Sequence, residues 1–271
     1  MSAKLVVVGG GRMGEALVGG LLAGGWDIAE LCVVEKLAER RRVLVERLPG
    51  LRVESAPPDA EGVVLAVKPV DVAASCQAVA DAGCARVLSI AAGVTLATLE
   101  EALGAQSNRL PVIRAMPNTP ALVGAGAAAV AGGTWAEDAD MSWAEGILAS
   151  VGTVVRVPEA QLDAVTGLSG SGPAYVFLVA EALIDAGVLV GLPHEVSHGL
   201  AVQTLLGAAR LLGESGETPS ALRGAVTSPG GTTAAGLRAL EARGLRSALV
   251  EAVVAATERS RQLGTAGATA P

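Results

Sequence analysis

The sequence predicts an N-terminal half built on a doubly wound parallel α/β sheet, followed by an all-helical C-terminal half. Short apolar runs alternate with helical segments as far as residue 157, which is the pattern of successive β-α units. Beyond residue 159 this alternation stops, and only long helical segments follow. We therefore expect one domain over residues 1–158, a helical domain over residues 159–264 and a disordered tail over residues 265–271.

The first element is a buried strand followed by a glycine-rich turn. Leu5 to Val8 form an apolar run suited to a strand covered on both faces, and glycines then follow with the spacing G-x-G-x-x-G. Gly9 permits a tight turn, Gly11 lets a pyrophosphate approach the backbone, and Gly14 allows close helix packing. The N–H groups at the start of the next helix favour phosphate. The pattern predicts a Rossmann-type dinucleotide site, with an ordinary glycine-rich turn as the alternative.

The second strand, at residues 31–34, ends beside charged residues that bear on the cofactor. Glu35 follows the strand about 20 residues after the glycines, where an acid accepts hydrogen bonds from ribose hydroxyls and favours NAD. Lys36 and the arginines at 40–42 follow at once, and they either hold a 2′-phosphate or form a solvated helix face. The choice between NADH and NADPH is therefore open.

Two further strands end in residues that can face a ligand, because the carboxyl ends of parallel strands meet at one edge of a sheet. Lys68, next to Pro69, follows the strand at 62–67 and either contacts the cofactor or lies in solvent. Asn118 follows the strand at 112–116 and either orients a nicotinamide or ribose or caps a turn. The other elements expected in this half are strands at 87–91, 126–131 and 154–157 and helices at 16–23, 96–103 and 137–150.

The C-terminal half combines apolar helices with a second glycine turn. Residues 176–186 are apolar almost all round, which suits a helix buried between other helices. The surplus of apolar helix surface indicates a subunit interface, or merely an alanine-rich composition. Between Thr227 and Thr233 a Pro-Gly-Gly turn leads into a helix, which favours an anion site over a plain helix cap. Further helices are expected at 194–212 and at 245–263. Between them, one helix is expected to begin at residue 219 and another to end at about residue 243.

Composition excludes several classes of function. A net charge of −7 and 2% aromatic residues argue against a nucleic-acid partner. No apolar run free of glycine and charge reaches membrane-spanning length. Three cysteines without C-x-x-C spacing indicate a reduced, cytoplasmic protein. His194 and His198 have a spacing that can bind metal, but a third ligand is not evident, so we expect no metal.

Five motifs together resemble the pyrroline-5-carboxylate reductase family and occur in that family's order across nearly the whole chain. They are A-V-K-P at 66–69, A-A-G-V-T at 91–95, R-A-M-P-N-T-P-A at 114–121, S-G-S-G-P-A-Y at 169–175 and T-S-P-G-G-T-T-A-A-G-L-R-A-L-E at 227–241. The resemblance implies reduction of L-1-pyrroline-5-carboxylate to L-proline with NADH or NADPH. It also implies a homodimer formed by the C-terminal helices, assembled further into rings such as decamers.

The resemblance also implies roles for individual residues. Thr233 would lie closest to the imine nitrogen and assist its protonation, and it is the candidate catalytic residue. The candidate substrate-binding residues are Gly230, Gly231, Thr232 and Thr233. The candidate cofactor-binding residues are Val8, Gly9, Gly10, Gly11, Arg12, Met13, Gly14, Glu35, Lys36, Ala66, Val67, Lys68, Pro69, Ala91, Ala92 and Asn118.

Two alternatives compete with this interpretation. Dehydrogenases of the 6-phosphogluconate and 3-hydroxyacid kinds also have a helical C-terminal half, but they use a lysine that this chain lacks between residues 169 and 185. A non-catalytic nucleotide sensor is the other alternative, and the second glycine turn argues against it.

Overall fold

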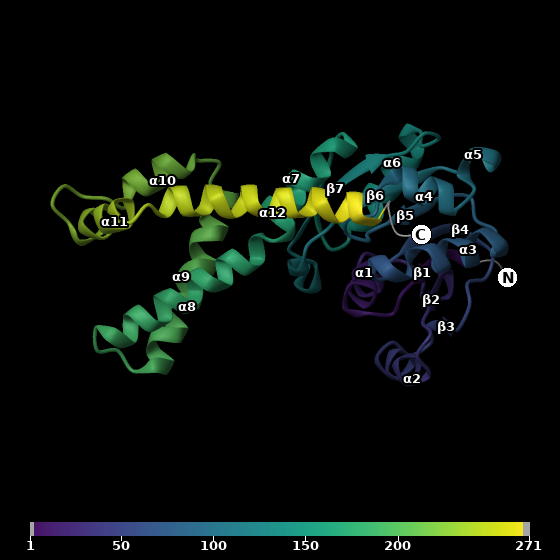
Figure 1. Ribbon diagram of the computed structural model, residues 1–271. Coiled ribbons are helices and arrows are strands. Elements are labelled where there is room, and N and C mark those ends of the chain that lie inside the picture. Colours follow the sequence, from purple (N-terminus) through teal and green to yellow (C-terminus); the bar gives the residue numbers. More distant parts are fainter. Residues whose placement is uncertain (1–2, 268–271) are drawn as a thin grey trace. The chain divides into compact units, whose positions relative to one another are not determined.

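The computed structural model describes residues 3–267, and Figure 1 shows their elements coloured along the chain. The chain forms two compact units. Unit 1 contains the residues through Ser171 together with those from Val254 onward, and unit 2 contains Gly172–Val253. The division into domains at residue 158 remains a prediction.

Unit 1 is built on a mainly parallel sheet with the strand order β3-β2-β1-β4-β5-β6-β7-β8, which confirms the predicted fold class. The strands β1 to β6 are parallel, whereas β7 is antiparallel to β6, and β8 is parallel to β7. Only residues 117–125 connect β6 to β7, too few for the crossover that a parallel pair requires. The strands are β1 Ala3–Val8, β2 Leu31–Val34, β3 Arg52–Glu54, β4 Ala60–Leu65, β5 Val87–Ser89, β6 Val112–Met116, β7 Gly126–Gly132 and β8 Gly152–Arg156.

Both faces of the sheet are covered, because successive side chains of each strand point to opposite sides. Val6 and Val8 of β1 belong to one buried cluster, and Leu5 and Val7 belong to the other. Helices α3, α4 and α7 contribute to the first cluster, and α1, α2 and α6 contribute to the second. The helices of unit 1 are α1 Arg12–Ala23, α2 Ala38–Arg47, α3 Val72–Ala82, α4 Leu96–Ala102, α5 Ala105–Asn108, α6 Asp138–Ala149 and α7 Leu162–Val165, with short turns η1 Ile28–Glu30, η2 Pro69–Asp71, η3 Thr119–Val123, η4 Glu159–Gln161 and the π-helical η5 Thr166–Gly170.

The edge strand β3 was not expected from the sequence. Its residues Arg52, Val53 and Glu54 alternate polar and apolar over only three positions, so they lack the apolar run by which the central strands are recognised. The strand pairs with β2 along its whole length. Its carboxyl end adds a further segment to the side of the sheet at which the ligand-binding residues were expected.

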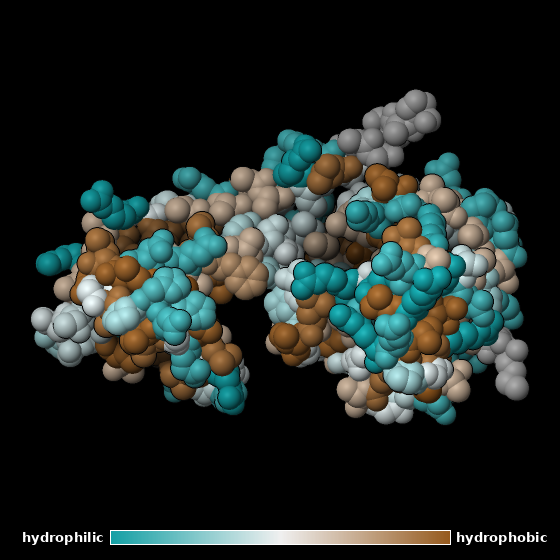
Figure 2. Space-filling model, turned by 90° about the horizontal axis from the view of Figure 1, so that it is seen from below, coloured by the Kyte–Doolittle hydropathy of each residue, from teal (hydrophilic) through white to brown (hydrophobic). Residues whose placement is uncertain are grey.

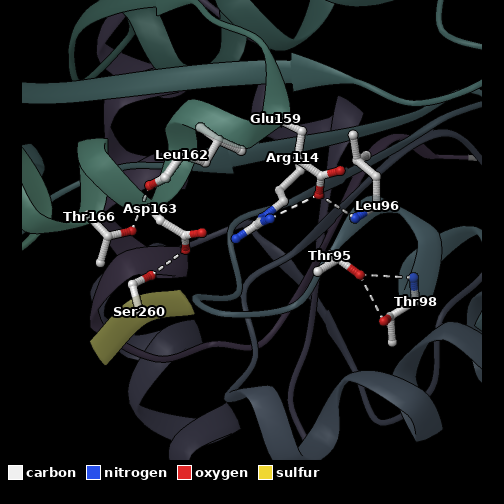
Figure 3. Close-up of polar contacts among 9 residues, drawn as sticks. All are labelled: Thr95, Leu96, Thr98, Arg114, Glu159, Leu162, Asp163, Thr166 and Ser260. Carbon is white, nitrogen blue, oxygen red and sulfur yellow. Dashed lines mark hydrogen bonds and ion pairs between the residues drawn. The ribbon is translucent and has the colours of Figure 1, made fainter. Parts of the chain in front are cut away.

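A polar cluster fixes the last part of unit 1 to the sheet (Figure 3). Arg114 on β6 is 7% exposed and donates to Glu159 Oε1 at 2.9 Å. The same oxygen accepts the N–H of Leu96 at the start of α4, at 2.6 Å. Nearby, Ser260 of α12 donates to Asp163 Oδ1 at 2.6 Å. These bonds join the segments through which the chain leaves unit 1 and returns to it.

Unit 2 consists of helices whose apolar side chains are largely exposed. Helices α8 and α9 form a pair in which Ser197 donates to the carbonyl of Ile184 at 2.7 Å. The prediction that residues 176–186 are buried between helices is wrong for the single chain, because no residue of α8 is buried within it. The helices are α8 Gly172–Leu189, α9 His194–Glu214, α10 Pro219–Ala225, α11 Thr232–Ala242 and α12 Leu245–Gly267, the last of which ends in unit 1.

The end of α12 corrects one boundary. The helix continues to Gly267, so residues 265–267 of the predicted tail are helical, and residues 268–271 lie outside the described residues. The helix passes Gly264 because its end packs on the turn at Gly93, whose carbonyl lies 3.5 Å from a Cβ built at Gly264. This packing offsets the helix-weakening effect of a glycine.

The polar cluster predicts a stability effect. We expect Arg114→Met to lower the free energy of unfolding by about 2 kcal/mol, because the half-buried Glu159 carboxylate loses its partner. Urea denaturation followed by tryptophan fluorescence measures this change in unit 1, which contains Trp26, Trp135 and Trp143.

A matched control removes a charge from an exposed pair. Glu30→Gln breaks the contact of Glu30 with Lys4, whose side chains are 37% and 46% exposed. We expect this control to change the unfolding free energy by less than about 0.5 kcal/mol. Equal effects of the two variants would contradict the stabilising role of Arg114.

Candidate functional site

The glycine turn after β1 is a close backbone contact between a strand and a helix. Gly9 has a φ of 109°, and a Cβ built there lies 2.4 Å from the carbonyl oxygen of Ala66. A Cβ at Gly14 would lie 2.1 Å from the carbonyl oxygen of Gly9. At Gly11, the residue that caps α1, a Cβ would have no atom within 4 Å. The first and third glycines are therefore required by packing, whereas the second leaves open space in front of the helix.

A pocket of ≈ 480 Å³ lies at the carboxyl edge of the sheet beside this turn. It is bounded by the segments that follow β1, β2, β3 and β4 and by α3. Its lining residues are Val8, Gly9, Gly11, Val34, Glu35, Lys36, Leu37, Ser55, Ala56, Pro57, Ala66, Val67, Lys68, Asp71, Ala74, Ser75 and Ala78. The volume and the position match a nucleotide site in an open α/β sheet.

The carboxylate of Glu35 is held at the end of β2 by backbone donors. Its Oε2 accepts the N–H of Gly10 at 3.1 Å, and its Oε1 accepts the N–H of Leu37 at 2.9 Å. The side chain thus joins the glycine turn to the segment after β2. A Cβ at Gly10 would approach Glu35 Oε2 to 3.2 Å, so the small residue also leaves room for this contact.

The first arginines of α2 are engaged with neighbouring protein groups. Arg40 donates to the carbonyl of Gly10 at 2.7 Å and pairs with Glu15 on α1, which also pairs with Arg47. Partial burial would raise the pKa of Glu15, but the hydrogen bonds and charges of both arginines outweigh it, and the pKa is lowered. Arg41 donates to the carbonyls of residues 35 and 36, at 2.8 Å each.

One buried hydroxyl in the pocket wall points to a ligand. Ser75 on α3 is 4% exposed, and its Oγ has no hydrogen-bond partner among the described residues. A buried hydroxyl without a partner is costly, so a polar ligand group beside it would be stabilising. Together with the open space at Gly11, this hydroxyl fits a bound dinucleotide.

The structure distributes the predicted cofactor residues along the same sheet edge. The pocket lining contains Val8, Gly9, Gly11, Glu35, Lys36, Ala66, Val67 and Lys68. Outside that lining, Gly10, Arg12, Met13 and Gly14 belong to the glycine turn and α1, Pro69 begins η2, and Ala91 and Ala92 follow β5. Sequence reasoning missed the other lining residues, which are Val34, Leu37, Ser55, Ala56, Pro57, Asp71, Ala74, Ser75 and Ala78. The signal for residues 55–57 was the short strand β3 before them.

Asn118 lies after β6, and both ends of its amide bind the protein. Its Nδ2 donates to the carbonyl of Ser169 at 3.0 Å, and its Oδ1 accepts the N–H of Ala127 at 2.8 Å. The side chain is 9% exposed and joins β6, β7 and the π-helical turn η5. This geometry supports the turn-capping role, and direct contact with a cofactor remains a prediction.

The second glycine turn belongs to unit 2 and opens α11. Gly230 has a φ of 72°, and Gly231 donates to the carbonyl of Ser228 at 3.0 Å. A Cβ at Gly231 would lie 2.5 Å from Ser228 Oγ and 3.2 Å from its carbonyl oxygen, so the turn is tightly packed there. Thr232 and Thr233 are the first residues of α11, where helical N–H groups lack intrahelical acceptors. The turn can therefore accept a small anion such as a carboxylate.

No group of three potential metal-binding side chains occurs among residues 3–267. His194 and His198 stack along α9 with ring centroids 6.4 Å apart. The cysteines Cys32, Cys76 and Cys84 are free, and burial raises the pKa of each thiol to about 11. These thiols are therefore poor nucleophiles.

Known proteins resemble this chain over nearly its full length. Residues 159–263 match the profile of pyrroline-5-carboxylate reductase dimerisation, and residues 4–93 match that of NADP oxidoreductase, coenzyme F420-dependent. The chain is 44% identical to a pyrroline-5-carboxylate reductase of Mycobacterium tuberculosis, over 96% of this chain and 97% of that protein. It is 40% identical to one of Arabidopsis thaliana, over 97% and 96%.

Solved structures agree with these sequence relationships. A pyrroline-5-carboxylate reductase from Coxiella burnetii has a TM-score of 0.89 at 36% identity, covering 97% of this chain and 99% of that one. A pyrroline carboxylate reductase from Plasmodium falciparum, with NADP bound, has a TM-score of 0.83 at 30% identity, covering 97% and 98%.

A substitution in the glycine turn should change the affinity for the dinucleotide without changing the stability of the fold. We expect Gly11→Ala to fold normally, because the added methyl meets open space, and to lower affinity for NAD⁺ at least about tenfold by obstructing the pyrophosphate. Isothermal titration calorimetry measures the affinity, and thermal unfolding measures the fold.

Gly19→Ala is the matched control, since it adds the same methyl in open space on α1 away from the turn. It should leave affinity unchanged and stabilise the helix by about 0.5–1 kcal/mol. Unchanged affinity in Gly11→Ala would contradict the assignment of phosphate binding to this turn.

Proposed function

The chain belongs to the pyrroline-5-carboxylate reductase family, and on that premise we propose that it reduces L-1-pyrroline-5-carboxylate to L-proline with NADH or NADPH. This reaction is the last step of proline biosynthesis. The main support for this proposal is the sequence identity of 40–44% to reductases of this name over nearly the whole chain. The pocket at the glycine turn supports it, because its open backbone and unpaired hydroxyl fit a dinucleotide.

In this reaction the main task of the protein is to bind the cofactor and the substrate and to orient them. A reduced nicotinamide, when bound, supplies the hydride. The glycine turn at Gly9 to Gly14 holds the pyrophosphate, and the residues after β4 and β5 extend that site along the sheet edge. The turn at Gly230 to Thr233 holds the substrate carboxylate on the N–H groups of α11. Alignment of the substrate and exclusion of water supply most of the rate enhancement.

We assign Thr233 the one polar contact to the reacting C=N bond. A hydroxyl both donates and accepts, so Thr233 Oγ1 can hold a proton at the ring nitrogen, directly or through a water molecule. Its place as the second residue of α11 puts it next to the N–H groups proposed to bind the carboxylate. Positively charged C=N is the better hydride acceptor, so this contact favours the reaction.

The apolar surface of unit 2 supports a dimer. Figure 2 shows brown, apolar side chains over much of this unit. Phe177 and Leu178 of α8 are 61% and 66% exposed. Residues 159–189 are long and apolar enough to cross a membrane by length and composition. We propose that a second copy covers this surface, since residues 159–263 match a dimerisation family. Larger rings such as decamers and a cytoplasmic location are also proposed, the latter from the free cysteines.

The activity is tested by following oxidation of NADH and NADPH with pyrroline-5-carboxylate. We expect oxidation that depends on substrate and yields proline, and no oxidation with either cofactor would overturn the proposed function. Thr233→Val should lower kcat/KM about 10- to 100-fold, because the ring nitrogen loses its polar contact.

Thr204→Val is the matched control, since it makes the same change at an exposed position of α9. Its kcat/KM should stay within about twofold of the parent. If Thr233→Val had the same kcat/KM as the parent protein across the pH range, the assigned role of this hydroxyl would be excluded.

The apolar surface predicts a dimer in solution. Phe177→Asp should shift the protein towards monomer, because a buried carboxylate would lie in the interface. Sedimentation analysis measures the mass without detergent, and Val45→Asp on α2 is the control in unit 1. A parent protein that is monomeric in buffer but binds vesicles would contradict the dimer and favour a membrane.

A further inference from the structure

The pocket extends from the glycine turn towards the ends of β2 and β3, where the adenosine ribose of a dinucleotide lies in such folds. An acid at the end of β2 accepts from the ribose 2′-hydroxyl, whereas a nearby arginine accommodates a 2′-phosphate. The groups gathered at this end therefore decide between NADH and NADPH. Their identities and partners can be read from the described contacts.

The acid is present and fixed. Glu35 lines the pocket, and its carboxylate stays in place because the N–H groups of Gly10 and Leu37 hold both of its oxygens. The carboxylate is therefore an acceptor fixed at the end of β2, which suits a ribose 2′-hydroxyl and disfavours a 2′-phosphate.

The arginines that follow are directed elsewhere. Arg40 binds the Gly10 carbonyl and Glu15, and its side chain is only 25% exposed. Arg41 donates to two backbone carbonyls at 2.8 Å. Arg42 lines a separate hollow on α2 and not this pocket. None of these three arginines belongs to the pocket lining.

The lysine at this end is paired with a carboxylate. Lys36 lines the pocket, but its Nζ lies 3.1 Å from Asp71 Oδ1, and Asp71 lines the pocket as well. The remaining lining cation, Lys68, follows β4, and β1 separates that strand from β2 in the sheet. The lining thus contains two carboxylates and two ammonium groups. Asp71 pairs with Lys36, whereas Glu35, the carboxylate at the end of β2, accepts backbone N–H groups.

We propose that this chain selects NADH over NADPH, and that Glu15 maintains the selectivity from outside the pocket by holding Arg40 on the glycine turn. The inference rests on the proposed reductase function. Glu35 is the residue that excludes the 2′-phosphate, and Glu15 is a positioning residue that acts through Arg40. Releasing Arg40 would supply the guanidinium that a 2′-phosphate requires.

Binding of the oxidised cofactors tests the selectivity without turnover. Isothermal titration calorimetry of the full chain with NAD⁺ and with NADP⁺ should give a Kd at least about tenfold lower for NAD⁺. The ratio of kcat/KM for NADH to that for NADPH should favour NADH similarly. Equal or tighter binding of NADP⁺ would overturn the inference, whereas NAD⁺ binding without pyrroline-5-carboxylate reduction would overturn only the proposed function.

Variants test the roles of the two acids. Glu35→Ser should lower the ratio of the Kd for NADP⁺ to the Kd for NAD⁺ about tenfold. Glu15→Ala should lower the same ratio about threefold or more, by tightening NADP⁺ binding. Adding Arg40→Ala to Glu15→Ala should remove that gain. A merely structural effect of Glu15→Ala would weaken the binding of both cofactors equally and leave the ratio of their Kd values unchanged. That result would overturn the role of Glu15.

Glu30→Gln is the matched control, because it removes one negative charge at the opposite end of β2, where Glu30 contacts Lys4. Its ratio of Kd values should equal that of the parent. A shift as large as that of Glu15→Ala would show that overall charge, and not the contact with Arg40, sets the preference.

Discussion

The site depends on a backbone contact that no side chain could replace. Gly14 of α1 lies against the carbonyl of Gly9, and Gly9 in turn lies against the carbonyl of Ala66 after β4. A Cβ at either glycine would overlap these oxygens. The contact sets the first turn of α1 against the sheet edge, so that its N–H groups face the pocket. The placement of Glu35 follows from it, because that carboxylate binds the N–H of Gly10 within the same turn.

A second constraint comes from the distribution of apolar surface. The sheet of unit 1 buries large side chains on both faces, whereas α8 of unit 2 has no buried residue within the single chain. Helices with so much exposed apolar surface are stable in water only when another surface covers them. The proposed dimer would therefore stabilise unit 2, the unit in which the second glycine turn opens α11.

The sequence predicts elements best where burial is continuous. Apolar runs identified β1, β2, β4, β5 and β6, and the glycine spacing identified the turn. The edge strand β3 was missed because it is short and polar, and the reversed direction of β7 depends on a loop length that periodicity does not register. The burial expected for residues 176–186 was wrong because apolar periodicity does not distinguish cover by the same chain from cover by a partner. Ser75 carries no local signal, since only the tertiary fold leaves its hydroxyl unpaired.

The charged groups around the pocket act on geometry and selectivity more than on chemistry. Glu35 binds backbone N–H groups, Glu15 binds arginines, and Asp71 binds Lys36, so each carboxylate is engaged with a partner in the protein. The arginines that pair with Glu15 lower the pKa of its carboxyl, so this acid is a poor general acid near neutral pH. A reduction that needs a hydride and one proton can proceed without these acids if a hydroxyl or water supplies the proton. These three carboxylates thus hold the glycine turn and its neighbouring cations, while the proposed role of Thr233 needs no carboxylic acid beside the substrate.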